Sequence, residues 1–289
     1  TMEVYQNAML LFLPIPAKSH YTFNLRDFAR VIQGILLVPA SRISEPEKMM
    51  RLWVHETFRV FYDRLVDQED REKLFEVVKK ACYHHIRTQM DKFLVDLIPE
   101  GETELQVEHL RSLFFGNYME PDADPKIYDE VTDHILLIER MQYYLDEYNT
   151  LSRTQMSLVM FKFAIEHISR VSRILQQDNG HALLVGIGGS GRQSATKLAT
   201  AMAQYVLFQI EIVRNYSMVE WREDVKKLLR RAGCDGKSQV FLFADSQIKD
   251  EAFIEDINMI LNTGDVPNLY ASDEKAEILE KMMDVARES

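Results

Sequence analysis

The sequence is short of the features that mark secreted and membrane-embedded proteins. It has 2 cysteines in 289 residues, Cys82 and Cys234, too few for a disulfide framework and without metal-binding spacing. We therefore expect a reducing compartment and two small, buried side chains. No apolar run approaches the length of a membrane span, and no secretory signal is visible at the N-terminus. We therefore expect no membrane partner.

Positive charge and glycine are also scarce. The chain has 34 Lys and Arg against 45 Asp and Glu, which gives a formal net charge of −11 at pH 7. Because a broad nucleic-acid-binding face needs the opposite sign, we expect no nucleic-acid partner. Of the 11 glycines, four fall within residues 186–191. That concentration marks the stretch around which the rest of the chain is organised.

The glycine-rich stretch has the sequence VGIGGSGRQS over residues 185–194. An apolar run at 182–185 precedes it and a helix-compatible run at 195–205 follows, which is the strand, loop and helix order of a phosphate-binding P-loop. Glycines let successive N–H groups turn inward, and the helix N-terminus adds partial positive charge. The candidate nucleotide-binding residues are Gly186, Ile187, Gly188, Gly189, Ser190, Gly191, Arg192, Gln193 and Ser194.

The loop departs from the usual Gly-Lys-Ser/Thr ending of this motif. Arg192 keeps a positive charge at the lysine position, as a planar fork rather than a point charge. Gln193 lacks the hydroxyl that normally ligates Mg²⁺. Ser194 is a weak substitute, because one residue along a helix turns a side chain by about 100°. The alternative interpretation is an ordinary glycine-rich turn beside an empty site.

Residues 1–115 are predicted to form a small helical bundle. Asn24, with Asp27 three residues later, is a good N-cap for a helix with apolar residues at helical spacing. Ser44 to Glu47 form a capping box with proline in the first turn and open a long helix. A further long helical run is predicted over residues 68–94.

Three features of this block suggest chemistry. Arg26 stands on the first turn of the helix capped by Asn24, where a cation could reach a phosphate, although a solvated or salt-bridged Arg is the commoner case. His55-Glu56 could begin a zinc-protease motif, but Arg59 occupies the place of the second histidine. His84-His85 are adjacent, so they are expected on different helix faces and make a poor metal pair.

The second part of the chain alternates helices with strands. Pro, Asp and Gly at 116–125 predict a linker, and helices are expected at 126–148 and 153–176. After the glycine-rich loop, strands are expected at 206–213 and 239–245. Between these strands, Ser217 and Glu220 form a capping box that opens another helix. The continuously apolar third strand is typical of a buried parallel sheet.

Asp245 ends this third strand, where a P-loop NTPase places the acid that supports the Mg²⁺ shell. The next position carries a water-activating Glu in active AAA+ ATPases, and here it is Ser246, which is no base at neutral pH. Glu251 is an alternative acid, expected about a helical turn away on the outside. We therefore hypothesise that the site binds nucleotide and hydrolyses it very slowly, with no catalytic residue of its own.

Residues 186–194, 243–248 and 261–269 together closely resemble the fourth AAA+ module of an axonemal dynein heavy chain of the inner-arm type. Residues 20–28 resemble the sensor-II segment in the lid of the preceding, third module. The resemblance implies an α/β fold, in which a helical lid subdomain at 1–115 precedes linker helices and a truncated large subdomain at 116–289. The latter would hold a partial P-loop AAA+ parallel sheet flanked by helices.

The resemblance implies a part of an ATP-driven microtubule motor ring of six modules. This segment would bind ATP or ADP, with Mg²⁺, in a regulatory and poorly hydrolysing site, and Arg26 would serve the third module's nucleotide. Implied partners are neighbouring modules of the same chain, microtubules through the parent's stalk, and dynein intermediate and light chains. The implied location is the cytoplasm and cytoskeleton, in the axoneme of a cilium or flagellum.

The alternative to a nucleotide-binding role is an empty structural ring segment that only transmits motion. A self-contained NTPase or kinase is disfavoured by Ser246.

The resemblance also raises a question about the sheet. AAA+ sheets have the strand order 5-1-4-3-2, and this sequence supplies only the first, second and third strands. Sensor I, the arginine finger and the fourth module's own lid are also absent. Because an unpaired strand edge is costly, we expect either a portion of a longer chain with a gap at the fourth strand, or a rearranged sheet.

Overall fold

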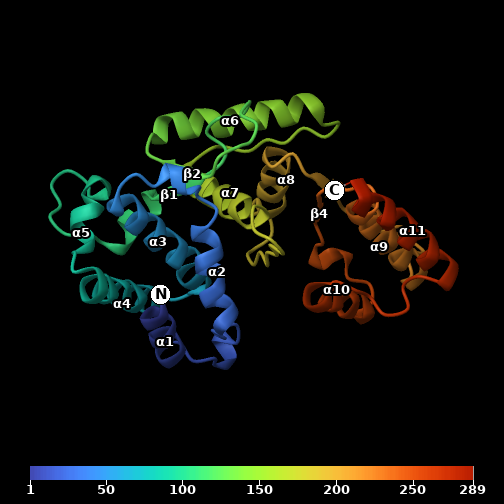
Figure 1. The fold of residues 1–289 in the computed structure, drawn as a ribbon, viewed down its shortest axis with the longest axis horizontal. Helices are drawn as coiled ribbons and strands as arrows, with labels where there is room; N and C mark the ends of the chain where they lie inside the picture. The colour runs from blue at the N-terminus through green and yellow to red at the C-terminus, as the bar shows by residue number, and fades with distance from the viewer. Residues whose placement is uncertain (289) are drawn as a thin grey trace. The chain divides into compact units, whose positions relative to one another are not determined.

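The computed structural model describes residues 1–288, which form two compact units (Figure 1). The first unit contains Thr1–Asp146 and Val159–Gly180, and the second contains Glu147–Leu158 and the chain from His181 onward. Both units have cores of buried apolar side chains. Within residues 1–288, no helix is both long enough and apolar enough to cross a membrane.

The first unit is mainly helical, as the sequence predicts for its N-terminal block. Its helices are α1 (Met2–Leu11), α2 (Leu25–Ile35), α3 (Pro46–Phe61), α4 (Gln68–Ile86), α5 (Met90–Phe93), α7 (Lys162–Leu175) and the first part of α6 (His134–Leu151). Short 3₁₀ turns join them at Pro16–Lys18, Ala40–Arg42, Tyr62–Arg64, Val95–Leu97 and Val107–Ser112. The core draws on α1 to α5 and is lined by fully buried residues such as Val4, Leu52 and Leu74.

Helix α2 begins where its cap predicts. The Asn24 side chain accepts a hydrogen bond from the Arg26 amide at 2.8 Å, and the Asp27 carboxylate accepts one from the Asn24 amide at 2.9 Å. The predicted cap of α3 was wrong, because Glu45 is the N-cap and no side chain bonds to the first turn. Pro46 sets the first helical φ and has no N–H to be capped, and the N-cap is Glu45, one residue after the predicted Ser44.

Helix α4 ends at Ile86, short of the predicted residue 94. Arg87 adopts a φ of 62°, which stops the helix, and α5 follows after a short gap. The predicted linker forms the turn of a hairpin, in which β1 (Phe114–Gly116) pairs antiparallel with β2 (Asp129–Val131). The predicted helix at 126–148 therefore starts only at α6, and that at 153–176 only at α7.

The second unit combines helices with a two-stranded parallel sheet. Its elements are α8 (Arg192–Met202), β3 (Val206–Phe208), α9 (Met218–Gly233), β4 (Gln239–Phe241), a 3₁₀ turn (Asp245–Gln247), α10 (Glu251–Thr263) and α11 (Ser272–Glu288). Strands β3 and β4 pair in register from Val206 opposite Gln239 to Phe208 opposite Phe241. The two predicted strands are thus neighbours and parallel, although both are shorter than the sequence indicates.

An aromatic pair anchors the core of the second unit. The Trp221 ring on α9 stacks on Phe253 of α10 with centroids 4.4 Å apart and planes 7° apart. The indole N–H donates to the Asp256 carboxylate at 2.9 Å, so the buried polar atom is satisfied. The capping box that opens α9 is confirmed, because the Ser217 hydroxyl accepts from the Val219 amide and the Glu220 carboxylate accepts from the Ser217 amide.

The predicted first strand, residues 182–185, is not formed. Leu183 and Val185 are 88% and 85% exposed, although both are apolar. In the order that the resemblance implies, this strand pairs with the fourth and fifth strands, and in this unit only β3 and β4 occur among residues 1–288. Without a neighbour, its backbone N–H and C=O groups have no ladder to join, so it stays irregular.

Candidate functional site

The glycine-rich loop forms a turn immediately before α8. Gly189 and Gly191 both adopt a φ of 77°, in the left-handed region that L side chains rarely occupy. The Ser190 amide donates to the Ile187 carbonyl at 3.3 Å and closes the turn. Apart from the two residues adjacent in the chain, no described residue has an atom within 4 Å of where a Cβ on Gly188 or Gly189 would stand. The loop surface is therefore open to an incoming group.

Free amide groups follow this turn at the start of α8. The first main-chain hydrogen bond of the helix runs from Ala195 N–H to the Gly191 carbonyl at 2.8 Å. The amides of Arg192, Gln193 and Ser194 have no backbone acceptor within residues 1–288. They lie at the positive end of the helix dipole. Together they offer the donors that a phosphate group would accept.

The Arg192 side chain folds back onto the loop. Its guanidinium donates to the carbonyls of Leu184 at 3.4 Å and Ile187 at 3.0 Å. These neutral acceptors are weaker than phosphate oxygens, which form charge-assisted, bidentate hydrogen bonds with guanidinium groups. The residues present therefore fit a phosphate-bearing ligand, provided that Arg192 exchanges its carbonyl acceptors for phosphate oxygens.

Asp245 and Ser246 follow β4 and are both exposed. The side chain that fixes this turn is Gln247, which is buried and which the sequence reasoning missed as a functional position. Its Oε1 accepts from the Ala244 amide and its Nε2 donates to the Ile210 carbonyl, each at 2.7 Å. Gln247 thus ties the end of β4 to the segment after β3. The available signal was half of a capping box, since Gln247 stands at N3, three residues after Ala244, whose side chain has no acceptor.

Arg26 lies exposed on the first turn of α2. Its amide is held by the Asn24 cap, and its guanidinium has no ion-pair partner in the part of the chain that the structure describes. The neighbouring Asp27 is instead buried and paired with Arg64. The local fold therefore presents Arg26 to solvent as an available cation.

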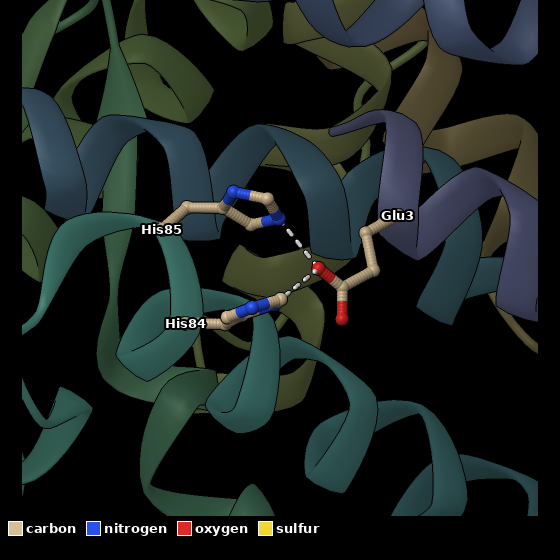
Figure 2. A group of neighbouring side chains, drawn as sticks. All are labelled: Glu3, His84 and His85. Carbon is tan, nitrogen blue, oxygen red and sulfur yellow. Dashed lines mark hydrogen bonds and ion pairs between the residues drawn. The ribbon is translucent and has the colours of Figure 1, made fainter.

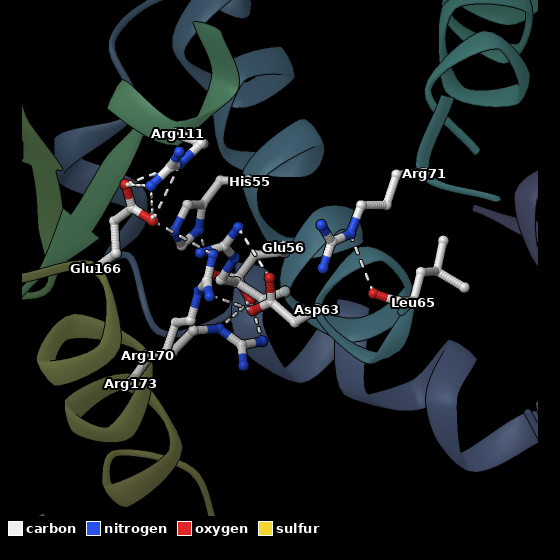
Figure 3. Close-up of polar contacts among 10 residues, drawn as sticks. His55, Glu56, Asp63, Leu65, Arg71, Arg111, Glu166, Arg170 and Arg173 are labelled. Atoms are coloured by element: carbon white, nitrogen blue, oxygen red, sulfur yellow. Dashed lines mark hydrogen bonds and ion pairs between the residues drawn. The ribbon is translucent and has the colours of Figure 1, made fainter. Parts of the chain in front are cut away.

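A buried group of charged residues, which the sequence reasoning also missed, joins α3 to α7 (Figure 3). Glu56 of α3 is 0% exposed, and it accepts from Nε of Arg173 on α7 at 2.8 Å. The hydroxyl of Tyr128 donates to the same carboxylate at 3.3 Å, and Nδ1 of His55 lies 3.1 Å from it. A buried charge needs such partners, because an unpaired one is costly.

The surroundings set the protonation of this group. Burial alone would raise the pKa of Glu56, but Arg173 and the hydrogen bond from His55 outweigh it and lower that pKa to about 2. Burial lowers the pKa of His55 to about 4. At neutral pH the carboxylate is therefore ionised and the imidazole neutral. Because a carboxylate only accepts hydrogen bonds, the His55 proton sits on Nδ1.

Two family models and several known proteins match this sequence. Residues 156–289 match the family described as P-loop containing dynein motor region D4, and residues 1–96 match the AAA+ lid domain. The chain is 57% identical over 287 residues to dynein axonemal heavy chain 3 of Homo sapiens, a match that covers 99% of this chain. The chain belongs to the axonemal dynein heavy chains. The predicted family and the partial α/β AAA+ fold are thus confirmed.

Other axonemal dyneins are similar across the same length. The chain is 44% identical over 282 residues to dynein axonemal heavy chain 1 of Mus musculus, and 43% identical over 288 residues to dynein axonemal heavy chain 2 of Mus musculus. These matches cover 98% and 99% of this chain and 6% of each relative, while the match to the human heavy chain 3 covers 7% of that protein. The chain therefore spans a small part of the dyneins that it resembles.

In this dynein chain the buried charged group joins two separately matched segments. Helix α3 lies within the lid match and α7 within the motor-region match, yet both helices belong to one compact unit. Further ion pairs extend the contact. Asp63 pairs with both Arg59 and Arg170. Glu166 pairs with Arg111 (Figure 3). The sequence signal was the spacing of the charges, since α7 carries Glu166, Arg170 and Arg173 at the i, i+4 and i+7 positions.

Proposed function

We propose that the loop at residues 186–194 of this axonemal dynein segment binds ATP or ADP in a regulatory site that hydrolyses nucleotide poorly. The observation that carries the proposal is the row of free amides at the start of α8, behind glycines at positive φ. Asp245 would support a Mg²⁺ shell, with the Ser194 hydroxyl as a weaker candidate. Ser246 stands where an active AAA+ site has its general base, which supports slow hydrolysis.

The wider role follows from the family. We assign residues 1–115 to the lid of the third module and residues 116–289 to linker helices and a truncated fourth module. The parent protein would be an ATP-driven microtubule motor of a ciliary or flagellar axoneme, within the cytoplasm and cytoskeleton. Its partners would be the neighbouring AAA+ modules, microtubules reached through its stalk, and dynein intermediate and light chains. The relatives' names, as dynein axonemal heavy chains, support this assignment.

Arg26 would act on a different nucleotide. We assign it the sensor-II role for the nucleotide of the third module, because its guanidinium is exposed on the first turn of a lid helix and has no ion-pair partner among the described residues. A guanidinium so placed offers bidentate hydrogen bonds to phosphate oxygens. An Arg26→Ala heavy chain should weaken nucleotide binding at the third module and leave binding at the fourth unchanged. If the Arg26→Ala and wild-type heavy chains bind nucleotide equally well at the third module, Arg26 does not have this role.

A second function is favoured by the buried charged group. The ion pairs between α3 and α7 link the lid-matched segment to the segment that leads along the chain into the glycine-rich loop. Such a contact would let the segment transmit conformational change through the ring toward the stalk, even with no nucleotide in the loop. The two functions differ in one measurable respect, which is nucleotide binding at residues 186–194.

Melting of the heavy-chain segment with and without Mg²⁺-ATP or Mg²⁺-ADP tests the first function. A bound nucleotide at 100 times its Kd should stabilise the fold by about 2.7 kcal/mol. Arg192→Ala should reduce this stabilisation, and Asp245→Asn should reduce its dependence on Mg²⁺. Glu255→Gln is the matched control, since that acid is also exposed, lies on α10 and has no assigned role in the site. If neither nucleotide raises the Tm, the transmitting function stands alone.

A further inference from the structure

Three side chains with metal-ligating atoms converge in the first unit (Figure 2). Glu3 projects from α1, and His84 and His85 project from the last turn of α4. The distance from Glu3 Oε2 is 2.5 Å to Nε2 of His85 and 3.3 Å to Nδ1 of His84. One ligand atom from each residue lies within 4.8 Å of the other two.

The sequence favours a poor metal pair at the adjacent histidines, yet the structure brings both of them to one carboxylate. The two imidazoles reach the same carboxylate with different nitrogens, Nδ1 of His84 and Nε2 of His85. Their ring centroids lie 4.8 Å apart. The third residue, Glu3, stands 82 positions before His85, so no sequence spacing could have indicated it.

The backbones that carry these side chains are held by the core, while the side chains themselves are open to solvent. Val4 and Ala8 of α1 and Val78 and Cys82 of α4 are all 0% exposed and belong to one apolar cluster. In contrast, the side chains of His84, His85 and Glu3 are 67%, 60% and 32% exposed. An ion could therefore enter from solvent and meet ligands whose backbone positions are already fixed.

We propose that Glu3, His84 and His85 bind a divalent transition-metal ion, with Zn²⁺ as the best fit. Two imidazole nitrogens and one carboxylate oxygen are the three protein ligands of an open zinc site, in which water takes the fourth position. Calcium and magnesium prefer oxygen ligands alone, so this donor set disfavours them.

The distances suit a zinc ion after a small adjustment. Bonds of about 2.0–2.1 Å in a tetrahedron separate neighbouring ligand atoms by about 3.3–3.5 Å. The 3.3 Å between His84 and Glu3 already meets this separation. The contact between His85 and Glu3 has to open by about 1 Å, which rotation about the bonds of an exposed side chain allows.

The competing state is a plain ion pair. In that state Glu3 Oε2 would accept the N–H protons of both imidazoles, from Nδ1 of His84 and Nε2 of His85. A zinc ion would replace those protons, because only neutral imidazole ligates a metal. The two states make opposite predictions for metal titration at neutral pH.

Titration of the polypeptide with Zn²⁺, followed by calorimetry, separates the two states. The wild-type chain should bind one ion. Glu3→Gln and His85→Asn should each weaken Zn²⁺ affinity by more than about tenfold, because removal of a residue that only hydrogen-bonds to a metal ligand already costs about that much. His20→Gln and Glu76→Gln are matched controls, because both residues are exposed in the same unit and belong to no metal cluster in the described chain. Circular dichroism checks that each variant folds.

Substitution with Co²⁺ gives a second readout that does not depend on stability. A tetrahedral site should give visible d–d absorption in the wild-type chain and the two controls, and that absorption should be lost in Glu3→Gln and His85→Asn. Absence of stoichiometric Zn²⁺ binding would overturn the proposal in favour of the ion pair. Equal binding by the wild-type chain and the two ligand variants would also overturn it.

Discussion

Glu56 and Arg173 form an ion pair inside the first unit, across 117 residues of sequence. Their side chains are 0% and 6% exposed, and Nε of Arg173 donates to the carboxylate at 2.8 Å. Taking both charges out of water is costly, and their mutual attraction offsets that cost only because the geometry and the extra hydrogen bonds are good. The pair therefore contributes less to stability than to the choice of which faces of α3 and α7 meet.

Breaking this ion pair should be strongly destabilising. Glu56→Gln leaves the Arg173 charge buried without its counter-charge, and Arg173→Met does the same to Glu56. We expect each to lower the free energy of unfolding by about 3–5 kcal/mol in chemical denaturation. The double variant should lose less than the sum of the two.

The control for that experiment is Glu69→Gln. Glu69 pairs with Lys73 on the exposed face of α4, so its removal should leave the denaturation midpoint nearly unchanged. Additive losses in the double variant of Glu56 and Arg173 would mean that the two residues do not interact as the structure indicates.

Gly34 on α2 should resist substitution by alanine. A Cβ at this position would stand 1.7 Å from Glu56 Oε2 and 2.8 Å from Nη2 of Arg173, so it would displace the buried ion pair. Alanine normally stabilises a helix by about 1 kcal/mol over glycine, but here we expect a net loss of about 1–3 kcal/mol.

Gly233 provides the matched comparison, because it is also helical. The nearest atom to a Cβ there is the sulfur of Met282 at 3.8 Å, an ordinary contact. Gly233→Ala should therefore leave stability unchanged or raise it by less than about 1 kcal/mol. A stabilising Gly34→Ala would show that α2 does not approach the ion pair so closely.

Stability should fall in mild acid because of His55. Burial lowers the pKa of this imidazole from 6.5 to about 4. Glu56 raises this pKa, whereas the charges of Arg59 and Arg173 lower it further. The unfolded chain then binds a proton that the folded chain excludes. The stabilisation is full above pH 6.5 and is lost as pH falls toward 4, by at most about 1.4 kcal/mol per pH unit.

The measurement is the free energy of unfolding against pH for the wild-type chain and His55→Gln. Glutamine keeps an N–H for Glu56 but does not titrate, so the slope between pH 6.5 and 4 should flatten. Glu56 titrates in a lower window, since its pKa falls from 4.5 to about 2 on folding. An unchanged slope in His55→Gln would assign the acid sensitivity to other groups.

Ser246→Glu should raise nucleotide hydrolysis at the proposed site of residues 186–194. The exposed turn after β4 would then carry a carboxylate that can activate water, which contributes on the order of 10²-fold or more to such reactions. Single-turnover hydrolysis in the heavy chain is the measurement, and Ser246→Gln, of similar size without a base, is the control. Wild-type hydrolysis as fast as that of an active AAA+ site would contradict the slow-site hypothesis.

Much of the local structure could be predicted because its causes lie within a few residues. The Asn24 and Ser217 caps and the glycine turn before α8 all depend on neighbours along the chain. The motifs around residues 186–194 and 243–248 also indicate the dynein family from sequence alone. The roles of Asp245, Ser246 and Arg26 remain predictions of that kind.

Other features depend on contacts between residues that lie far apart in the sequence. The hairpin of β1 and β2, the Gln247 bridge, the Glu56–Arg173 pair and the meeting of Glu3 with His85 all join residues that local patterns treat as unrelated. Residues 182–185 show the converse, since a good strand sequence stays irregular where no neighbouring strand completes its hydrogen bonds. The caps of α2 and α9 and the glycine turn follow from short-range chemistry along the chain, so local patterns predict them. Tertiary contacts fix which charges are buried together and which strands exist, because both require a partner brought from a distance.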